Sequence, residues 1–388
     1  MSRTIKPWAG AFLTTAITVG LSASSIPSSA ADSAASHRHR AGVASTPVVV
    51  ATGLHNPRDL TVQRDGSVLV AESGSGSGTA CQTRPGPPVR CFGLTGSIYK
   101  VAGRKKGRVV TGLPSQELAP YGGPSSVYGL NQVEAAGNGS YRGVYGLIGL
   151  PSTRTDLGAG SGPLATLSIV NGKVLGDLAA HEAEHDPDAV LGNTLPASNP
   201  QRFVRDGKDF LVTDAAANDV IRVHPDGTTE TEVVLPNNVL PATSAGAAAG
   251  TTAEGSKAEA VPTGIVRGRD GAFYISDLSG AHNGLGRLWR YVAGSEPTVF
   301  ADGLSSVIDL AVAPNGDLIA LSYSTGNAPG TPTGALNRID RRTGALTPIK
   351  SDTPLTMPTG LDVTRRGDIY ITNNSLSSEG ELLKFRAL

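Results

Sequence analysis

The stretch Asn56-Pro57-Arg58-Asp59-Leu60-Thr61-Val62, followed by Asp65-Gly66 and then by Val68-Leu69-Val70-Ala71-Glu72, decides the fold of this chain. It is a short apolar run, a turn dipeptide, and a second apolar run that ends on a polar residue. The pattern returns six times in 388 residues. Clear copies begin at Asn199, Pro262, Ile308 and Pro358, and a weaker copy begins at Pro124 and resumes at Val144. Repeats at such spacing indicate a repeat architecture.

Each copy of the pattern is typical of a β-hairpin. The Asp-Gly or Asn-Gly dipeptide between the two runs suits the positive φ angles of a two-residue hairpin turn. A third apolar run with one cationic residue follows, as in Gly96–Val101, and a fourth follows that, as in Arg108–Leu113. Six units of four antiparallel strands predict an all-β fold, a six-bladed β-propeller.

The two ends of the repeat region predict how the ring closes. The sixth copy reaches Leu388 after only three strands. At the other end, Pro47–Leu54 carries the same Thr-Gly-Leu ending as the fourth strand that ends at Leu113. We therefore expect this N-terminal strand to complete the last blade. The alternative is a separate edge strand on the first blade.

The N-terminal residues resemble an export signal. Arg3 and Lys6 precede the apolar stretch Ala9–Ala23, and small residues follow at 28–31. We expect a signal peptide at 1–31, a disordered linker at 32–46, and a single propeller domain at 47–388. The apolar stretch is too short and too polar to span a bilayer, so we expect a secreted monomer without a membrane span.

The charge balance of the chain argues against nucleic acid as a partner. There are 33 Lys and Arg residues against 33 Asp and Glu residues, with no basic stripe, so nothing supports nucleic-acid binding.

The two cysteines, Cys81 and Cys91, lie in one loop of an exported chain, which suggests a disulfide. The segment Leu240–Ala260 is of low complexity and is expected to form a mobile surface loop.

The predicted topology gathers polar residues at one mouth of the propeller, where the second strand of each blade ends and the first begins. Carboxylates and amides that converge on the axis could hold Ca²⁺, which prefers oxygen ligands. The alternative is that such residues start turns by bonding their own backbone. The mouth-facing candidates are Asn56, Glu72, Asn199, Asp214, Thr263, Asp277, Asp309, Thr359, Asn373 and Asn374; the calcium candidates among them are Glu72, Asp214, Asp277 and Asn373.

A second motif, His181-Glu182-Ala183-Glu184-His185, matches the His-Glu-x-x-His pattern of zinc peptidases. In that pattern the two histidines bind Zn²⁺ and the first glutamate acts as a base. Asp186-Pro187 would end a helix at once, and the segment joins two blades, where no substrate cleft is expected. We therefore favour a short solvated helix over a zinc site at His181 and His185.

Several phrases of the sequence resemble a known family. They include "ATGLHNPRDLTV", "GDLAAHEAEHDPD", "LVTDAAANDVIRVHPDG" and "PTGLDVTRRGDIYITNNS". Together the chain from Thr46 to Leu388 resembles the ScyD/ScyE family of secreted β-propeller proteins, and more distantly NHL, gluconolactonase-like and strictosidine-synthase-like propellers. The resemblance implies the fold and export.

These observations lead to two functional hypotheses. The first is a non-catalytic binding or scaffold protein whose mouth loops hold a small molecule, a glycan or a protein partner. The alternative is a Ca²⁺-dependent hydrolase of lactones or related esters, in which the metal would polarise the carbonyl and activate water.

Overall fold

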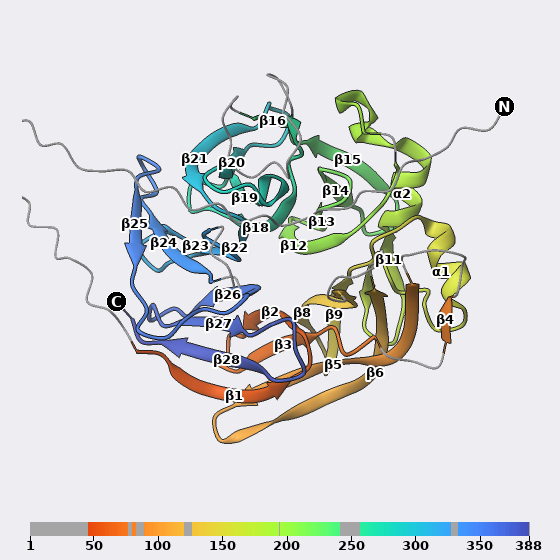
Figure 1. Cartoon of the computed structure of the whole chain (residues 1–388), viewed down its shortest axis with the longest axis horizontal. Helices are drawn as coiled ribbons and strands as arrows, with labels where there is room; N and C mark the ends of the chain where they lie inside the picture. The colour runs from red at the N-terminus through yellow and green to blue at the C-terminus, as the bar shows by residue number, and fades with distance from the viewer. Residues whose placement is uncertain are drawn as a thin grey trace, which may run out of the picture.

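The computed structural model shows a ring of six four-stranded antiparallel sheets around a central axis (Figure 1). It describes residues 46–76, 80–82, 89–119, 126–193, 195–240, 257–326 and 333–387. The predicted six-bladed propeller is confirmed. The expected signal peptide, nearly all of the linker and most of the low-complexity segment lie outside the described residues.

In the first three blades the strands follow one another in chain order from the axis outward, with β4 outside this order in blade 1. Blade 1 consists of β2 (Pro57–Val62), β3 (Val68–Glu72), β5 (Val89–Ala102) and β6 (Lys105–Ala119). Blade 2 consists of β8 (Leu130–Gly137), β9 (Ser140–Tyr145), β10 (Thr166–Ile169) and β11 (Val174–Asp177). Blade 3 consists of β12 (Pro200–Asp206), β13 (Asp209–Asp214), β14 (Asp219–Val223) and β15 (Thr229–Val234).

The last three blades follow the same plan. Blade 4 consists of β18 (Pro262–Arg267), β19 (Phe273–Asp277), β20 (Gly286–Tyr291) and β21 (Thr298–Leu304). Blade 5 consists of β22 (Val307–Val312), β23 (Leu318–Ser322), β24 (Ala335–Ile339) and β25 (Leu346–Ile349). Blade 6 consists of β26 (Gly360–Val363), β27 (Ile369–Asn373), β28 (Gly380–Phe385) and the N-terminal β1 (Val48–Leu54).

Ring closure by the N-terminal strand is confirmed. The strand β1 pairs antiparallel with β28, with Val48 opposite Lys384 and Leu54 opposite Gly380. Figure 1 shows this orange-red strand lying along the blue β28. The two ends of the propeller domain are thus hydrogen-bonded into one sheet, in which β1 supplies the outer strand that blade 6 would otherwise lack.

The hairpin turn between the first two strands has the expected two-residue form in blades 2 and 3, where Gly137 pairs with Ser140 and Asp206 with Asp209, and a different form in the other four blades. Gly66 takes a φ of 80°, whereas Asp65 does not take a positive φ. The Gly66 N–H donates to the Gln63 carbonyl at 2.9 Å, and the Gln63 N–H donates to the Ser67 carbonyl at 2.7 Å. This is a three-residue loop that needs only one positive φ, at the glycine. The same pair of bonds recurs at the turns that end in Gly271, Gly316 and Gly367.

The weak repeat copy begins later than predicted. The axial strand of blade 2 is β8, whose Asn138-Gly139 turn leads into β9. The segment at Ser126 instead forms β7 (Ser126–Tyr128), which pairs with the outer strand β6 of blade 1. The prediction assigned Pro124 to the start of this repeat because the axial strand of blade 2 lacks the proline that opens most other axial strands.

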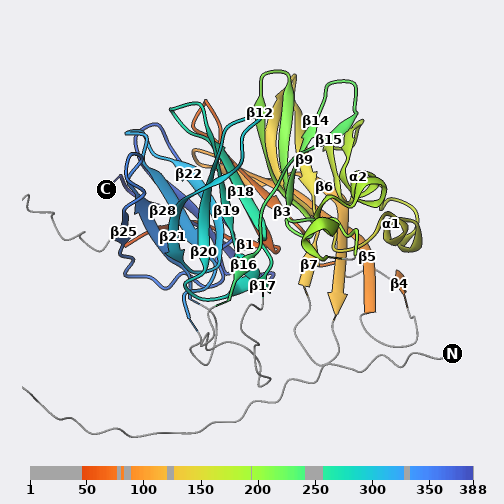
Figure 2. The same cartoon turned by 90° about the horizontal axis from the view of Figure 1, so that it is seen from above.

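Short elements outside the blades decorate blades 1 to 4. The helix α1 (Pro151–Leu157) lies beside β4 (Ala80–Gln82), and α2 (Leu178–His185) packs against β10 of blade 2 and β15 of blade 3 (Figures 1 and 2). The predicted disulfide is confirmed, since Cys81 of β4 is bonded to Cys91 of β5. A small ladder of β16 (Asn238–Val239) and β17 (Lys257–Ala258) flanks the low-complexity segment. None of the described helices is long and apolar enough to cross a membrane.

The core consists of apolar clusters between neighbouring blades, and polar side chains near the axis join the blades to one another. One bond of this kind spans each of the six seams. They are Ser73 Oγ to the Leu130 carbonyl (3.1 Å), Asn131 Nδ2 to the Pro200 carbonyl (2.7 Å), Thr213 Oγ1 to the Thr263 carbonyl (2.6 Å), Thr263 Oγ1 to the Val307 carbonyl (2.9 Å), the Leu361 N–H to Asp309 Oδ2 (2.8 Å), and Thr359 Oγ1 to the Pro57 carbonyl (2.9 Å).

Candidate functional site

The four residues predicted to hold Ca²⁺ occupy one structural position, the last residue of the second strand. Each accepts the backbone N–H of a residue just before the first strand of the same blade. The bonds are His55 N–H to Glu72 (2.7 Å), Asn199 N–H to Asp214 (2.6 Å), Val261 N–H to Asp277 (3.1 Å) and Thr356 N–H to Asn373 (2.7 Å). These side chains therefore close the mouth end of the hairpin in each of four blades.

The remaining oxygens of these side chains are also engaged. Glu72 accepts from Ser97 and from both Nε and Nη2 of Arg108, and Asp277 accepts from the Trp289 indole at 3.0 Å. Among the described residues, Glu72, Asp214 and Asp277 do not form a cluster of ligand atoms. The geometry favours the interpretation in which these side chains accept hydrogen bonds from the backbone. Calcium binding by them at the axis stays a prediction.

The other mouth-facing candidates serve the loops and the seams. Asn56 donates to the Gly74 carbonyl at 2.8 Å, and Asn374 donates to the Glu379 carbonyl at 3.1 Å. Both adopt positive φ angles, 45° and 52°, that asparagine tolerates in turns. Thr359 lines a cavity at the axis, and Asp309 accepts the Leu361 N–H across the seam between blades 5 and 6.

A cavity of about 210 Å³ opens where the predicted mouth lies. Its walls come from the beginnings of axial strands and from the residues that follow second strands. The lining residues are Arg58, Ser126, Tyr128, Asn131, Gln201, Arg202, Leu278, Ile308, Tyr323, Thr359 and Leu376. All six blades contribute to this lining, and so does the strand β7, which pairs with blade 1. The cavity is therefore the axial mouth.

Arg202 holds the cavity floor together. Its Nε lies 3.1 Å from Asp59 of blade 1, and its Nη2 lies 3.6 Å from Asp309 of blade 5. The same Nη2 donates to the Thr359 carbonyl of blade 6 at 2.7 Å. Burial raises the pKa of Asp59 well above its ordinary value, Arg202 opposes this rise, and Asp309 adds to it. One arginine thus connects blade 3 to blades 1, 5 and 6 across the axis and lies between two aspartates.

Arg58 in the cavity wall has a different environment. Its Nε donates to Ser73 Oγ at 3.3 Å and its Nη2 donates to the Val127 carbonyl. Within the described part of the chain, Arg58 forms no ion pair with a carboxylate. Burial lowers the pKa of Arg58, the neighbouring tyrosines Tyr128 and Tyr323 raise it, and the cationic Arg202 lowers it further. The mouth therefore presents a half-buried cation without a carboxylate partner in the described part of the chain.

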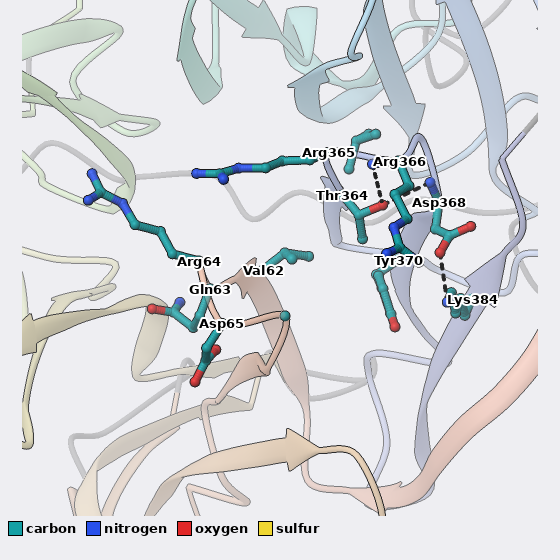
Figure 3. A pocket seen from close by; sticks show the side chains of 12 residues that line it. Val62, Gln63, Arg64, Asp65, Thr364, Arg365, Arg366, Asp368, Tyr370 and Lys384 are labelled. Atoms are coloured by element: carbon teal, nitrogen blue, oxygen red, sulfur yellow. Dashed lines mark hydrogen bonds and ion pairs between the residues drawn. The ribbon is translucent and has the colours of Figure 1, made fainter.

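A second cavity lies at the opposite end of the propeller, between the hairpin turns of blades 1 and 6 (Figure 3). It is larger, about 570 Å³. In Figure 3 the side chains of Arg64 and Arg365 extend in the same direction, and Asp368 pairs with Lys384 at 2.7 Å. Arg64 and Arg365 are exposed, so water and salt already solvate their charges. We therefore place the candidate site at the mouth.

The His-Glu-x-x-His segment forms the predicted helix, α2, which ends at His185 before the left-handed Asp186. The expectation of a fully solvated helix is wrong, because His181 and Glu182 are 2% and 0% exposed. His181 packs on β15, and its ring nitrogens lie 3.1 Å and 2.8 Å from the hydroxyls of Thr229 and Thr231. His185 is exposed, and its ring centroid lies 4.6 Å from that of His181.

Sequence reasoning missed the residues that line the mouth most closely. Arg58 and Arg202 lie near the beginnings of β2 and β12, shortly after Asn56-Pro57 and Asn199-Pro200. A charged residue in the innermost strand of a propeller is a signal that could have been read. Tyr128, the last residue of β7, and Tyr323, which directly follows β23, carried no such signal.

No family model matches the sequence, and no curated protein matches it either. Solved propellers are similar in structure. A putative gluconolactonase is 13% identical, with 89% of this chain and 94% of that chain covered and a TM-score of 0.46. An inactive virginiamycin B lyase from Staphylococcus aureus with quinupristin is 14% identical, with coverages of 88% and 99% and a TM-score of 0.44. The PQQ-bound aldose sugar dehydrogenase from Streptomyces coelicolor is 10% identical, with coverages of 87% and 96% and a TM-score of 0.43.

Proposed function

We propose that this chain is a binding protein that captures a small organic anion in the axial mouth. The observation that carries the proposal is Arg58, a half-buried cation that lines the cavity beside a second arginine, without a carboxylate partner among the described residues. A buried charge is costly unless it is paired. A bound carboxylate would supply the missing pair and would accept hydrogen bonds from a planar guanidinium.

The size and walls of the cavity narrow the ligand class. A volume of about 210 Å³ lies below the usual range for drug-sized ligands, so a compact acid or the acidic end of a longer molecule fits best. Tyr128 and Tyr323 offer ring faces and hydroxyls, and Leu278, Ile308 and Leu376 add apolar surface. This mixture suits a ring-bearing carboxylate, such as an aromatic acid or a sugar acid.

We place this function outside the cell, in a monomer of the ScyD/ScyE type. Three observations support the placement: the export-like first residues, the resemblance of the repeats, and the Cys81–Cys91 disulfide, a bond typical of oxidising compartments.

The proposal is tested by titrating the protein with matched pairs of ligands, such as glucuronate and glucose, or benzoate and benzamide. Binding is followed by calorimetry and by the rise in melting temperature. We expect the acids to bind and their neutral analogues to bind about tenfold more weakly or not at all, since a charged hydrogen bond contributes about 1.5–3 kcal/mol.

The matched variants are Arg58→Gln at the mouth and Arg64→Gln at the opposite cavity. Both remove one positive charge, but only Arg58→Gln is expected to weaken acid binding, by about tenfold or more. Equal binding of acids and neutral analogues, or equal weakening by the two variants, would overturn the proposal.

The lactonase hypothesis remains the alternative. It requires metal ligands around the mouth, whereas Glu72, Asp214, Asp277 and Asn373 accept hydrogen bonds within their own blades. A lactone panel with added Ca²⁺ would test it directly, and turnover that depends on Glu72 or Asp277 would favour it over the binding hypothesis.

A further inference from the structure

A cluster of acidic side chains lies beside blade 3, away from the axial cavity. It is formed where α2 and the 3₁₀ helix that follows it, Pro187–Leu191, pack near the beginning of β14. Ligand atoms of His181, Glu182 and Asp219 lie within 4.8 Å of one another. Glu182 and Asp219 are both 0% exposed.

The carboxylate oxygens in this cluster lack hydrogen-bond partners. Among the described residues, neither oxygen of Glu182 and neither oxygen of Asp219 has one, although all four are buried. The same holds there for Oδ1 of Asp186, the residue that follows α2, and for Oδ1 of Asn218, the residue before Asp219. Buried polar atoms in folded proteins nearly always have partners, so several unpartnered oxygens in one place require an explanation.

The surrounding charges make the cluster more negative. Asp188 and Asp214 repel Glu182 and Asp219, and Asp186 repels Glu182. Within the described residues, none of these five carboxyl groups forms an ion pair with Lys, Arg or His. The described residues therefore leave the negative charge of these carboxylates without a cationic partner.

We propose that Glu182 and Asp219 bind a Ca²⁺ ion that fastens α2 to blade 3. Their four buried oxygens lack partners among the described residues, and ligand atoms of the two side chains lie within 4.8 Å of one another. Two bidentate carboxylates give four oxygen donors, and water molecules would complete the six to eight oxygens that Ca²⁺ takes in flexible geometry.

The donor set favours calcium over zinc. Zn²⁺ sites in proteins are built mainly from histidine and cysteine. Both nitrogens of His181 already face threonine hydroxyls, at 3.1 Å and 2.8 Å, and both cysteines form the disulfide. The ion would hold the connector between blades 2 and 3 against the beginning of β14, independently of any ligand at the mouth.

The test uses the full chain, stripped with EDTA and then dialysed against millimolar CaCl₂, MgCl₂ or ZnCl₂. Metal content is measured by elemental mass spectrometry, and the melting temperature is recorded with and without each ion. We expect a single Ca²⁺ per chain and a melting temperature several degrees higher in calcium than in EDTA, because a ligand of the folded state stabilises it.

Two isosteric variants locate the ion, Glu182→Gln and Asp219→Asn. Each is expected to lose the bound Ca²⁺ and the calcium-dependent rise in melting temperature while still folding in EDTA. The control is Glu184→Gln, which removes the same charge from the exposed side of the same helix and should bind calcium as the wild type does. Absence of calcium in the wild type, retention of calcium by both variants, or stoichiometric zinc that is lost in His181→Gln would overturn the proposal.

Discussion

At the scale of single residues, the polar side chains that end the second strands stabilise the mouth by accepting hydrogen bonds from backbone N–H groups. Asp277 shows the arrangement most fully. Its Oδ1 accepts the N–H groups of Val261 and Ser279, and its Oδ2 accepts the Trp289 indole. The carboxylate is fully buried, and its partners would lose their acceptor if it were removed.

Replacing this carboxylate tests its structural role. We expect Asp277→Ala to lower the free energy of unfolding by about 2–4 kcal/mol, because buried donors are left unsatisfied. Asp277→Asn keeps one acceptor oxygen and should cost less. The exposed Asp302→Ala is the control and should stay within about 0.5 kcal/mol of the wild type in urea unfolding. A negligible effect of Asp277→Ala would contradict the role described.

At the scale of elements, β1 is the strand that turns an open arc of blades into a ring. It is far in sequence from β28, with which it pairs, and its inner side chains join the core between blades 6 and 1. Leu54 is 0% exposed and packs in one cluster with Leu60, Val70 and Leu382. Closure therefore rests on apolar packing as well as on the ladder.

Truncating that side chain measures how much the closing strand contributes. We expect Leu54→Ala to destabilise the protein by about 2–5 kcal/mol, as large-to-small changes in a core do. Val49→Ala on the same strand, at a side chain 50% exposed, should change stability by about 0.5 kcal/mol or less. Similar small effects for both variants in urea unfolding would show that β1 is only a loosely attached edge.

At the scale of the whole molecule, the ring places acidic groups at the seams, where burial changes their proton affinity. Asp362 of blade 6 accepts the Val62 N–H of blade 1 at 2.7 Å and the Val363 N–H at 2.7 Å. Burial raises the pKa of Asp362 from 3.8 to about 6, against the lowering effect of these hydrogen bonds. The folded state thus binds this proton more tightly than the unfolded chain does.

This shift predicts how stability depends on pH. The stabilisation from protonated Asp362 is fully present below the unfolded pKa and is lost as pH rises through about 6. Between pH 4.5 and 7.5 the wild type should lose about 1–3 kcal/mol relative to Asp362→Asn, which cannot titrate. Urea unfolding of both proteins across this range provides the measurement, and parallel profiles would contradict the assignment.

The fold was predictable because local signals agreed with the global pattern. Alternating Val, Leu and Ile, with a glycine at each hairpin turn, specify strands and turns without any distant information. The Thr-Gly-Leu likeness of β1 to another fourth strand was enough to predict the closure. The candidate site was predictable only in part, since the mouth was located from topology, whereas Arg58 and Arg202 were overlooked and Glu72 was proposed as a metal ligand.

The sequence by itself determined the number of blades, the strand order, the closure and the disulfide, because each follows from patterns between residues close in sequence or from a repeated phrase. Only the tertiary structure decided which polar residues meet. Arg202 reaches Asp59 and Asp309 across the axis, and Glu182 meets Asp219 beside blade 3. Such contacts depend on the curvature of the ring and on how a connector packs against it. A local pattern of residues predicts neither.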